Sequence, residues 1–158
     1  MVAEPLQRAL SCVTRSVLVG GARRPGVGLH MLDLAAGGQV PLAGKHRLLL
    51  RLRYDLDVVQ QPAGTWSAIV AGYRCELSDA DERELLAYHW HPQGVSPIIW
   101  PHLHVSASVA PIDLTRAHLP TGPVALRCAA ADLGVRPLRQ DWAAVLANAE
   151  RALADSAE

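Results

Sequence analysis

The stretch from His46 to Val59 alternates apolar and polar side chains in the clearest strand pattern of the chain. One set of alternate positions is mainly apolar and consists of His46, Leu48, Leu50, Leu52, Tyr54, Leu56 and Val58. The other set is mainly charged and consists of Arg47, Leu49, Arg51, Arg53, Asp55 and Asp57. Successive side chains of a strand point to opposite faces, so the pattern predicts a half-buried strand with one solvated face.

Other segments extend this strand into a sheet. Residues 65–77 are rich in strand-forming residues, and residues 85–91 and 102–109 read as two further strands. A short strand is expected around residues 27–34, and the polar segment SDADERE is expected to form a turn or one turn of helix. Because the connections are mostly short, we expect an antiparallel β-meander of four or five strands within residues 46–109 and their neighbours.

Helical periodicity marks both ends of the chain. Leu6, Leu10, Val13 and Val17 recur at helical spacing, and Gly20-Gly21 would end the segment, which predicts a helix within residues 1–21. Two further helices are expected within residues 123–154. Pro123 would open the first, Gly134 would cap its end, and Asp141 would cap the start of the second. The fold class is therefore α+β in a single domain of residues 1–158, with the helices packed on one face of the sheet.

Composition narrows the classes of protein that fit. A chain of 158 residues with 50% hydrophobic residues can bury roughly 70% of its unfolded surface, so it needs no disulfide to hold a core. Fifteen basic and fifteen acidic residues leave no net charge, which argues against a general nucleic-acid binder. Cys12, Cys75 and Cys128 fit no paired pattern, and no apolar run is long enough for a membrane span. We therefore expect a cytoplasmic protein without a membrane partner.

Four of the seven histidines fall between His89 and His104, in two H-x-H pairs. Residues two apart on a strand share a face, so each pair would place two imidazoles about 6 to 7 Å apart. A hairpin register that pairs His91 with His102 also pairs His89 with His104, so one register would align all four in a compact rectangle. The same register sends Tyr88 and Trp90 to the core side, opposite Val105 and Leu103, and pairs Ser106 with Ala87.

Such a cluster supports several kinds of chemistry. His89, His91, His102 and His104 could supply two, three or four nitrogens to zinc or another divalent transition metal. Three of them with an open coordination position would resemble a hydrolytic metal site. Two histidines could instead act as general base and general acid in phosphodiester cleavage without a metal. The histidines could also simply face solvent.

Residues elsewhere are candidates for substrate binding. If the charged face of residues 46–59 is also the histidine face, Arg51 and Arg53 could bind phosphate, and Asp55 and Asp57 could help to orient an imidazole. Ser106 would lie beside His104 on that face. His30, His46 and His118 are isolated in the sequence and carry no assigned role.

Three short segments resemble the TumE-like toxins of bacterial toxin-antitoxin systems. They are RYD at Arg53 to Asp55, the Tyr88-His89 pair, and PHLH at Pro101 to His104. The resemblance implies a small toxin that acts on RNA and is neutralised by a cognate antitoxin protein. It carries over to Arg53, Asp55, His102 and His104 alone.

The segment HLHVS, from His102 to Ser106, is also similar to the histidine strand of histidine-triad nucleotide hydrolases and to one element of two-histidine phosphoesterases. The first similarity implies that His104 would be the nucleophile, with Ser106 in place of the third histidine. Cupins also use H-x-H, but the Glu and Gly spacing expected after His91 is missing, so we set them aside.

The leading hypothesis is a histidine-dependent phosphodiesterase or ribonuclease, with His102 and His104 central and His89 and His91 supporting. RNA or a nucleotide would be its substrate. The alternative is a non-enzymatic binding module, whose histidines hold a structural metal or none. A metal-dependent oxygenase would require iron or copper in place of zinc.

Overall fold

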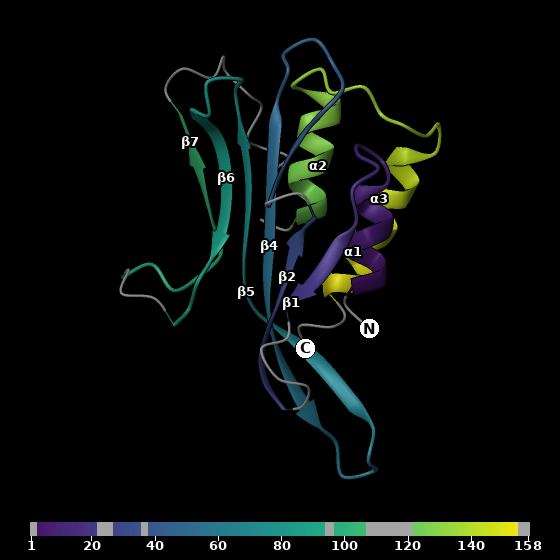
Figure 1. The fold of residues 1–158 in the computed structure, drawn as a ribbon, viewed down its shortest axis with the longest axis vertical. Helices are drawn as coiled ribbons and strands as arrows, with labels where there is room; N and C mark the ends of the chain where they lie inside the picture. Colours follow the sequence, from purple (N-terminus) through teal and green to yellow (C-terminus); the bar gives the residue numbers. More distant parts are fainter. Residues whose placement is uncertain (1–2, 22–26, 36–37, 94–96, 107–121, 155–158) are drawn as a thin grey trace.

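The computed structural model describes residues 3–21, 27–35, 38–93, 97–106 and 122–154. Within them the chain forms three helices and seven strands (Figure 1). In chain order these are α1 (Ala3–Leu10), β1 (Leu18–Gly21), β2 (Gly28–Leu34), β3 (Gln39–Pro41), β4 (Leu49–Gln60), β5 (Trp66–Ser78), β6 (Glu84–Trp90), β7 (His102–Val105), α2 (Gly122–Ala131) and α3 (Trp142–Ala154). The expected α+β class, with an antiparallel sheet and two helices near the C-terminal end, is confirmed.

All seven strands belong to one antiparallel sheet in the order β1-β2-β4-β5-β6-β7, and β3 also pairs with β4. The two short strands β2 and β3 lie end to end along the same edge of β4, since β3 pairs with residues 49–51 and β2 with residues 53–58. The sheet thus has more strands than the four or five expected. The strands missed by the sequence analysis are β1 and β3, which are only four and three residues long.

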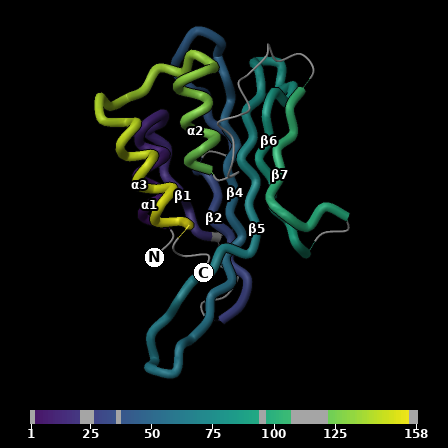
Figure 2. The backbone as a smooth tube through the Cα atoms, turned by 180° about the vertical axis from the view of Figure 1, so that it is seen from behind, coloured from purple at the N-terminus to yellow at the C-terminus, as the bar shows by residue number. Residues whose placement is uncertain are grey.

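The helices form a layer on one face of the sheet, as Figures 1 and 2 show from opposite sides. The core lies between this layer and the sheet. The alternate residues Leu50, Leu52 and Tyr54 of β4 are buried there, together with Leu77 of β5 and Tyr88 of β6. The expected placement of the helices is therefore confirmed. The other alternate positions carry the charged residues and the histidines, and none of the described helices covers that face.

The N-terminal helix is shorter than residues 1–21, because α1 ends at Leu10 and residues 18–21 form β1. The side chain of Gln7 stabilises the reversal between them. Its amide nitrogen donates to the Ser16 carbonyl oxygen at 3.2 Å, and its amide oxygen accepts from the Leu18 backbone N–H at 2.7 Å. The helical spacing of Val13 and Val17 therefore does not reflect a helix. Val17 directly precedes β1, and its β-branched side chain favours extended backbone.

Three local predictions about the connections can be compared with the structure. Residues 79–83 form a turn in which the Asp79 carboxylate accepts hydrogen bonds from the backbone N–H groups of Asp81 and Arg83. Gly134 follows α2 with a φ of 68°, the left-handed conformation typical of a helix C-terminus. Asp141 precedes α3 as expected, but both of its carboxylate oxygens accept hydrogen bonds from Arg139, at 2.7 and 2.8 Å.

Within the described part of the chain, no helix has the length and apolar character required to cross a membrane.

Candidate functional site

The four clustered histidines converge on the face of the sheet opposite the helices. His89 is the centre of the group, with ring centroids 6.1 Å from His91, 5.8 Å from His102 and 4.9 Å from His104. His102 lies 5.2 Å from His91 and 5.0 Å from His104. The predicted histidine cluster is therefore present.

The hairpin register differs from the predicted one by two residues. β6 and β7 pair His89 with His102, Ala87 with His104, Tyr88 with Leu103 and Leu86 with Val105. A slip of two residues keeps every side chain on its face, so the apolar pattern could not distinguish the two registers. In the observed register Pro101 would lie opposite Trp90, and because Pro101 has no backbone N–H, pairing ends at His89 and His102.

The register changes the shape of the cluster from a rectangle to a staggered group. His89 faces His102 directly, while His91 lies diagonally beyond the end of the ladder and His104 faces Ala87. Ser106 does not pair with Ala87 as predicted. Its backbone N–H donates to the Leu85 carbonyl oxygen at 2.9 Å, which extends the hairpin by one hydrogen bond.

The aromatic residues of the hairpin point to the core side, as predicted. Tyr88 is fully buried, and the Trp90 ring packs 6.2 Å from that of Tyr73. The indole N–H of Trp90 donates to the Ile99 carbonyl oxygen at 3.1 Å, which fixes part of the loop between the two strands. The packed side of the hairpin thus supports the histidines on its other face.

A hydrogen bond selects the tautomer of His102, and burial selects the charge of His89. The Nδ1 atom of His102 lies 2.9 Å from the Trp100 carbonyl oxygen. Because a carbonyl only accepts, Nδ1 carries the proton of the neutral ring and Nε2 carries a lone pair. Burial, with the nearby charge of Arg74 and the other imidazoles, lowers the pKa of His89 to about 4, so this ring is neutral at pH 7.

A row of polar residues crosses the sheet through this cluster. Arg53 of β4 faces Arg74 of β5, Arg74 faces His89 of β6, and His89 faces His102 of β7. Neighbouring strands lie about 4.8 Å apart, so Arg74 is the arginine nearest to the imidazoles. Arg51, Arg53 and Asp55 share this face with the histidines, which was the condition for assigning them a role in substrate binding, whereas Arg74 was missed. The pattern that could have indicated Arg74 is the alternation of Arg74 and Glu76 with the apolar Cys75 between them, since Cys75 is buried and the two charged side chains point to the other face.

Ion pairs link the charged residues of this face. Arg53 donates to the Asp55 carboxylate through Nε at 3.1 Å and Nη2 at 3.0 Å. Arg74 Nη2 lies 2.7 Å from Glu76 Oε2, and Arg51 Nη1 lies 3.7 Å from the same oxygen. Glu76 is buried, so its charge requires these partners. The arginines are thereby held along the open face beside the histidines.

The remaining predicted residues lie outside the cluster. Asp57 faces Leu29 and Ile69, beyond a bulge that separates it from Asp55. His30 belongs to β2 and faces Leu56, and His46 lies in the loop before β4. His118 and residues 107–109 of the predicted strand 102–109 lie outside the described residues.

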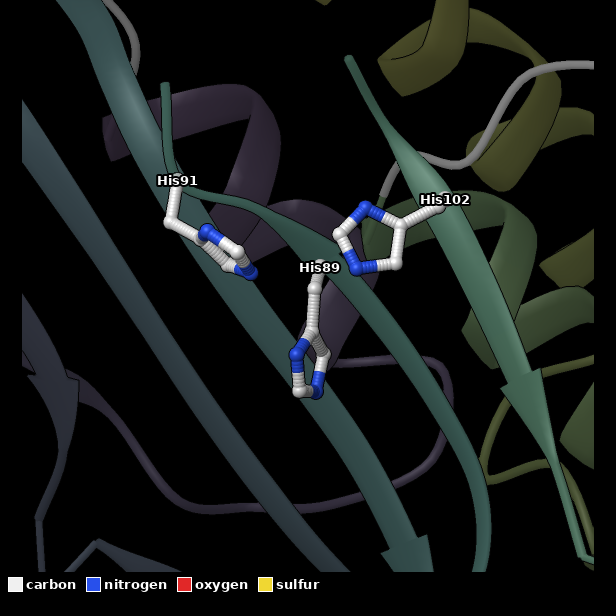
Figure 3. A group of neighbouring side chains, drawn as sticks. All are labelled: His89, His91 and His102. Carbon is white, nitrogen blue, oxygen red and sulfur yellow. The ribbon is translucent and has the colours of Figure 1, made fainter. Parts of the chain in front are cut away.

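Three of the four histidines have the arrangement of a metal-binding group. One nitrogen each from His89, His91 and His102 lies within 4.8 Å of the other two (Figure 3). His104 does not belong to this group, so of the two, three or four nitrogens that the sequence could supply, three have this arrangement. Neutral imidazoles are common ligands of zinc and related metals.

Comparison of the chain with protein-family models, curated proteins and solved structures finds no match.

Proposed function

We propose that the protein is a histidine-dependent phosphodiesterase that cleaves RNA on the open face of its sheet. The observation that carries the proposal is the row from Arg53 through Arg74 and His89 to His102. It combines guanidinium groups, which bind phosphate oxygens, with imidazoles, which transfer protons near neutral pH.

Two histidines have suitable positions for the chemical step. The lone pair on His102 Nε2 activates the attacking oxygen, and the Nδ1 bond to Trp100 keeps the ring in that tautomer. The exposed His104, with its ring centroid 5.0 Å from that of His102, donates a proton to the leaving oxygen. A bond to phosphorus forms as the bond to the leaving oxygen breaks, and the two imidazoles exchange roles in protonation.

RNA is favoured as the substrate for two reasons. The residues that resemble TumE-like toxins, Arg53, Asp55, His102 and His104, all lie on this face. The arginines are also concentrated on one face of a chain with no net charge, so an RNA backbone would be bound at that face and not over the whole surface. The same resemblance implies a cognate antitoxin protein that neutralises the cleavage of RNA.

The test is cleavage of RNA, cyclic nucleotides and dinucleotides by the purified full chain. We expect His102→Ala and His104→Ala each to reduce kcat by about 100-fold or more, the usual contribution of a general acid or base. Arg53→Gln should mainly raise KM, because it removes a phosphate contact. The matched control is His46→Ala, an exposed histidine outside the cluster, which should retain full activity. Equal activity of wild type and both cluster variants on every substrate would exclude the proposal.

A further inference from the structure

Three of the clustered histidines lie on or directly beside the adjacent strands β6 and β7. His89 lies near the end of β6, His91 is the first residue after that strand, and His102 is the first residue of β7, directly opposite His89. Figure 3 shows the three rings directed toward a common space. We propose that His89, His91 and His102 bind one divalent transition-metal ion, for which zinc is the best match, and leave a fourth coordination position open.

The distances are close to those that such a site needs. Zinc-to-nitrogen bonds of about 2.0 to 2.1 Å place the nitrogens of a tetrahedral site about 3.3 to 3.4 Å apart. Here the three nitrogens lie within 4.8 Å of one another. Rotation of the side chains can close a gap of roughly 1.5 Å without movement of the strands.

The hydrogen bonds of the rings are a second, independent observation. His89 Nε2 is buried and has no hydrogen-bond partner among the described residues, which is a costly arrangement unless a ligand occupies it. His102 Nδ1 is already bonded to the Trp100 carbonyl oxygen, so its Nε2 lone pair is available. A backbone carbonyl on the second nitrogen is a common support for a metal-binding histidine.

Ring orientation explains why the site has three ligands and not four. A nitrogen lone pair lies in the plane of its ring, so the lone pairs of parallel stacked rings do not converge. The His104 ring is stacked on His89 at an interplanar angle of 22°. The three proposed ligands are steeply inclined to one another, with angles of 57°, 67° and 89°. His104 is therefore left beside the open position.

Local charge is compatible with a dication. Arg74 faces His89 and would repel a metal ion, but Arg74 lies 2.7 Å from Glu76 and 3.7 Å from Glu84. With Arg51, which also pairs with Glu76, two positive charges are balanced by two negative ones. The imidazoles therefore meet the ion in surroundings of no net charge.

The inference rests on the proposed function only for the role of the open position. A water molecule bound there loses a proton more readily than bulk water and can attack phosphorus. With the ion bound, the His102 Nε2 lone pair is used for coordination, so the ion replaces His102 in activating the attacking water, whose proton passes to solvent. The bond from this oxygen to phosphorus forms as the bond to the leaving oxygen breaks, and His104 protonates the leaving oxygen. Metal binding itself does not depend on this chemistry.

The test is titration of the metal-free full chain with zinc by calorimetry, and with cobalt by visible absorption. We expect one ion per chain and the absorption bands of tetrahedral cobalt with nitrogen ligands. Loss of a group that only supports a ligand typically weakens metal binding 10- to 100-fold. His91→Ala and His102→Ala each remove a ligand itself, so each should weaken zinc binding at least about 100-fold. His104→Ala and His46→Ala should bind within a few-fold of wild type. Circular dichroism checks that each variant folds. If His91→Ala or His102→Ala does not fold, His91→Gln or His102→Gln is used in its place.

Two results would overturn the metal site. One is the absence of stoichiometric zinc binding by the wild-type chain. The other is a His104→Ala variant that loses as much affinity as His91→Ala. The outcome is separable from that of the proposed function. Stoichiometric zinc binding that is weakened in His91→Ala and His102→Ala, without cleavage of any substrate, would support the metal site and exclude the phosphodiesterase. Cleavage that a chelator does not affect, by a chain that binds no zinc, would support the phosphodiesterase and exclude the metal site.

Discussion

Two tyrosines that share the core side of the sheet show how differently similar residues can contribute to stability. Tyr54 and Tyr73 lie on adjacent strands with ring centroids 5.5 Å apart, and both are buried. The Tyr54 hydroxyl accepts a hydrogen bond from the Gly122 backbone N–H at the start of α2, at 3.0 Å. The Tyr73 hydroxyl is buried without a hydrogen-bond partner among the described residues. One hydroxyl therefore joins sheet and helix, and the other is a buried polar atom without compensation.

Replacement of each tyrosine by phenylalanine should have unequal effects. Tyr54→Phe leaves the Gly122 N–H without its acceptor, so we expect a loss of about 1 to 3 kcal/mol in the free energy of unfolding. Tyr73→Phe removes an unsatisfied hydroxyl and should be neutral or slightly stabilising. Urea denaturation of both variants measures the difference. A larger loss for Tyr73→Phe than for Tyr54→Phe would show that the Tyr73 hydroxyl has a partner.

Among the secondary-structure elements, the sheet edge formed by β1 depends on a single side chain of α1. Gln7 bonds both the Ser16 carbonyl and the Leu18 N–H, so it fixes the chain where the helix ends and the strand begins. Four pairs join β1 to β2, from Leu18 with Leu34 to Gly21 with Met31. Beyond these pairs and the packing of Leu18 against the core, Gln7 provides the side-chain hydrogen bonds that fix the start of this edge strand.

Gln7→Ala should therefore destabilise the protein by about 1 to 2 kcal/mol, the usual effect of two lost hydrogen bonds in a partly buried place. It should also speed amide exchange at Leu18 more than at residues of β5. Gln7→Glu is the matched control, because its carboxylate can still accept from Leu18 while the bond to Ser16 is lost. If Gln7→Ala left both stability and exchange at Leu18 unchanged, the backbone alone would define the reversal.

The sequence pattern predicted the elements better than their pairing. The alternation in residues 46–59 correctly placed Leu50, Leu52 and Tyr54 in the core and Arg51, Arg53 and Asp55 on the open face. It could not distinguish hairpin registers that differ by two residues, since both keep the same faces. β1 was missed because a helical spacing that begins at Leu6 continues to Val17, directly before this strand, and because the reversal depends on contacts of the Gln7 side chain with backbone about ten residues away. Arg74 was missed because its role arises from its neighbours on β4 and β6.

Across the molecule, the helix layer is joined to the sheet by the segment between α2 and α3. Gly44, in the loop after β3, forms an antiparallel bridge with Val135. The Lys45 N–H donates to the Gly134 carbonyl oxygen at 3.2 Å, and the Arg136 N–H donates to the Ala43 carbonyl oxygen at 2.7 Å. These backbone contacts bring together segments about 90 residues apart in the chain, from Ala43 to Arg136.

Gly44→Ala should disrupt this junction. A Cβ atom at position 44 would overlap the Gly134 carbonyl oxygen and lie 2.9 Å from Val135 Cα, so the backbone would have to move. We expect a loss of about 2 kcal/mol or more in the free energy of unfolding, in the range of other strained packing changes. The control is Gly20→Ala, where a Cβ would only touch Leu32 at 3.8 Å. Thermal unfolding compares the two, and equal melting temperatures would mean that the junction tolerates a shift.

The position of β7 at the end of the strand order has a consequence for how tightly anything can be bound by the histidines. His102 and His104 are in place only while this four-residue strand is paired with β6. The apparent affinity of the site is therefore its intrinsic affinity multiplied by the fraction of chains in which β7 is paired. Reciprocally, each tenfold excess of ligand over its Kd adds about 1.4 kcal/mol to the stability of that pairing. Occupancy of the site and closure of the sheet edge are thus one linked equilibrium.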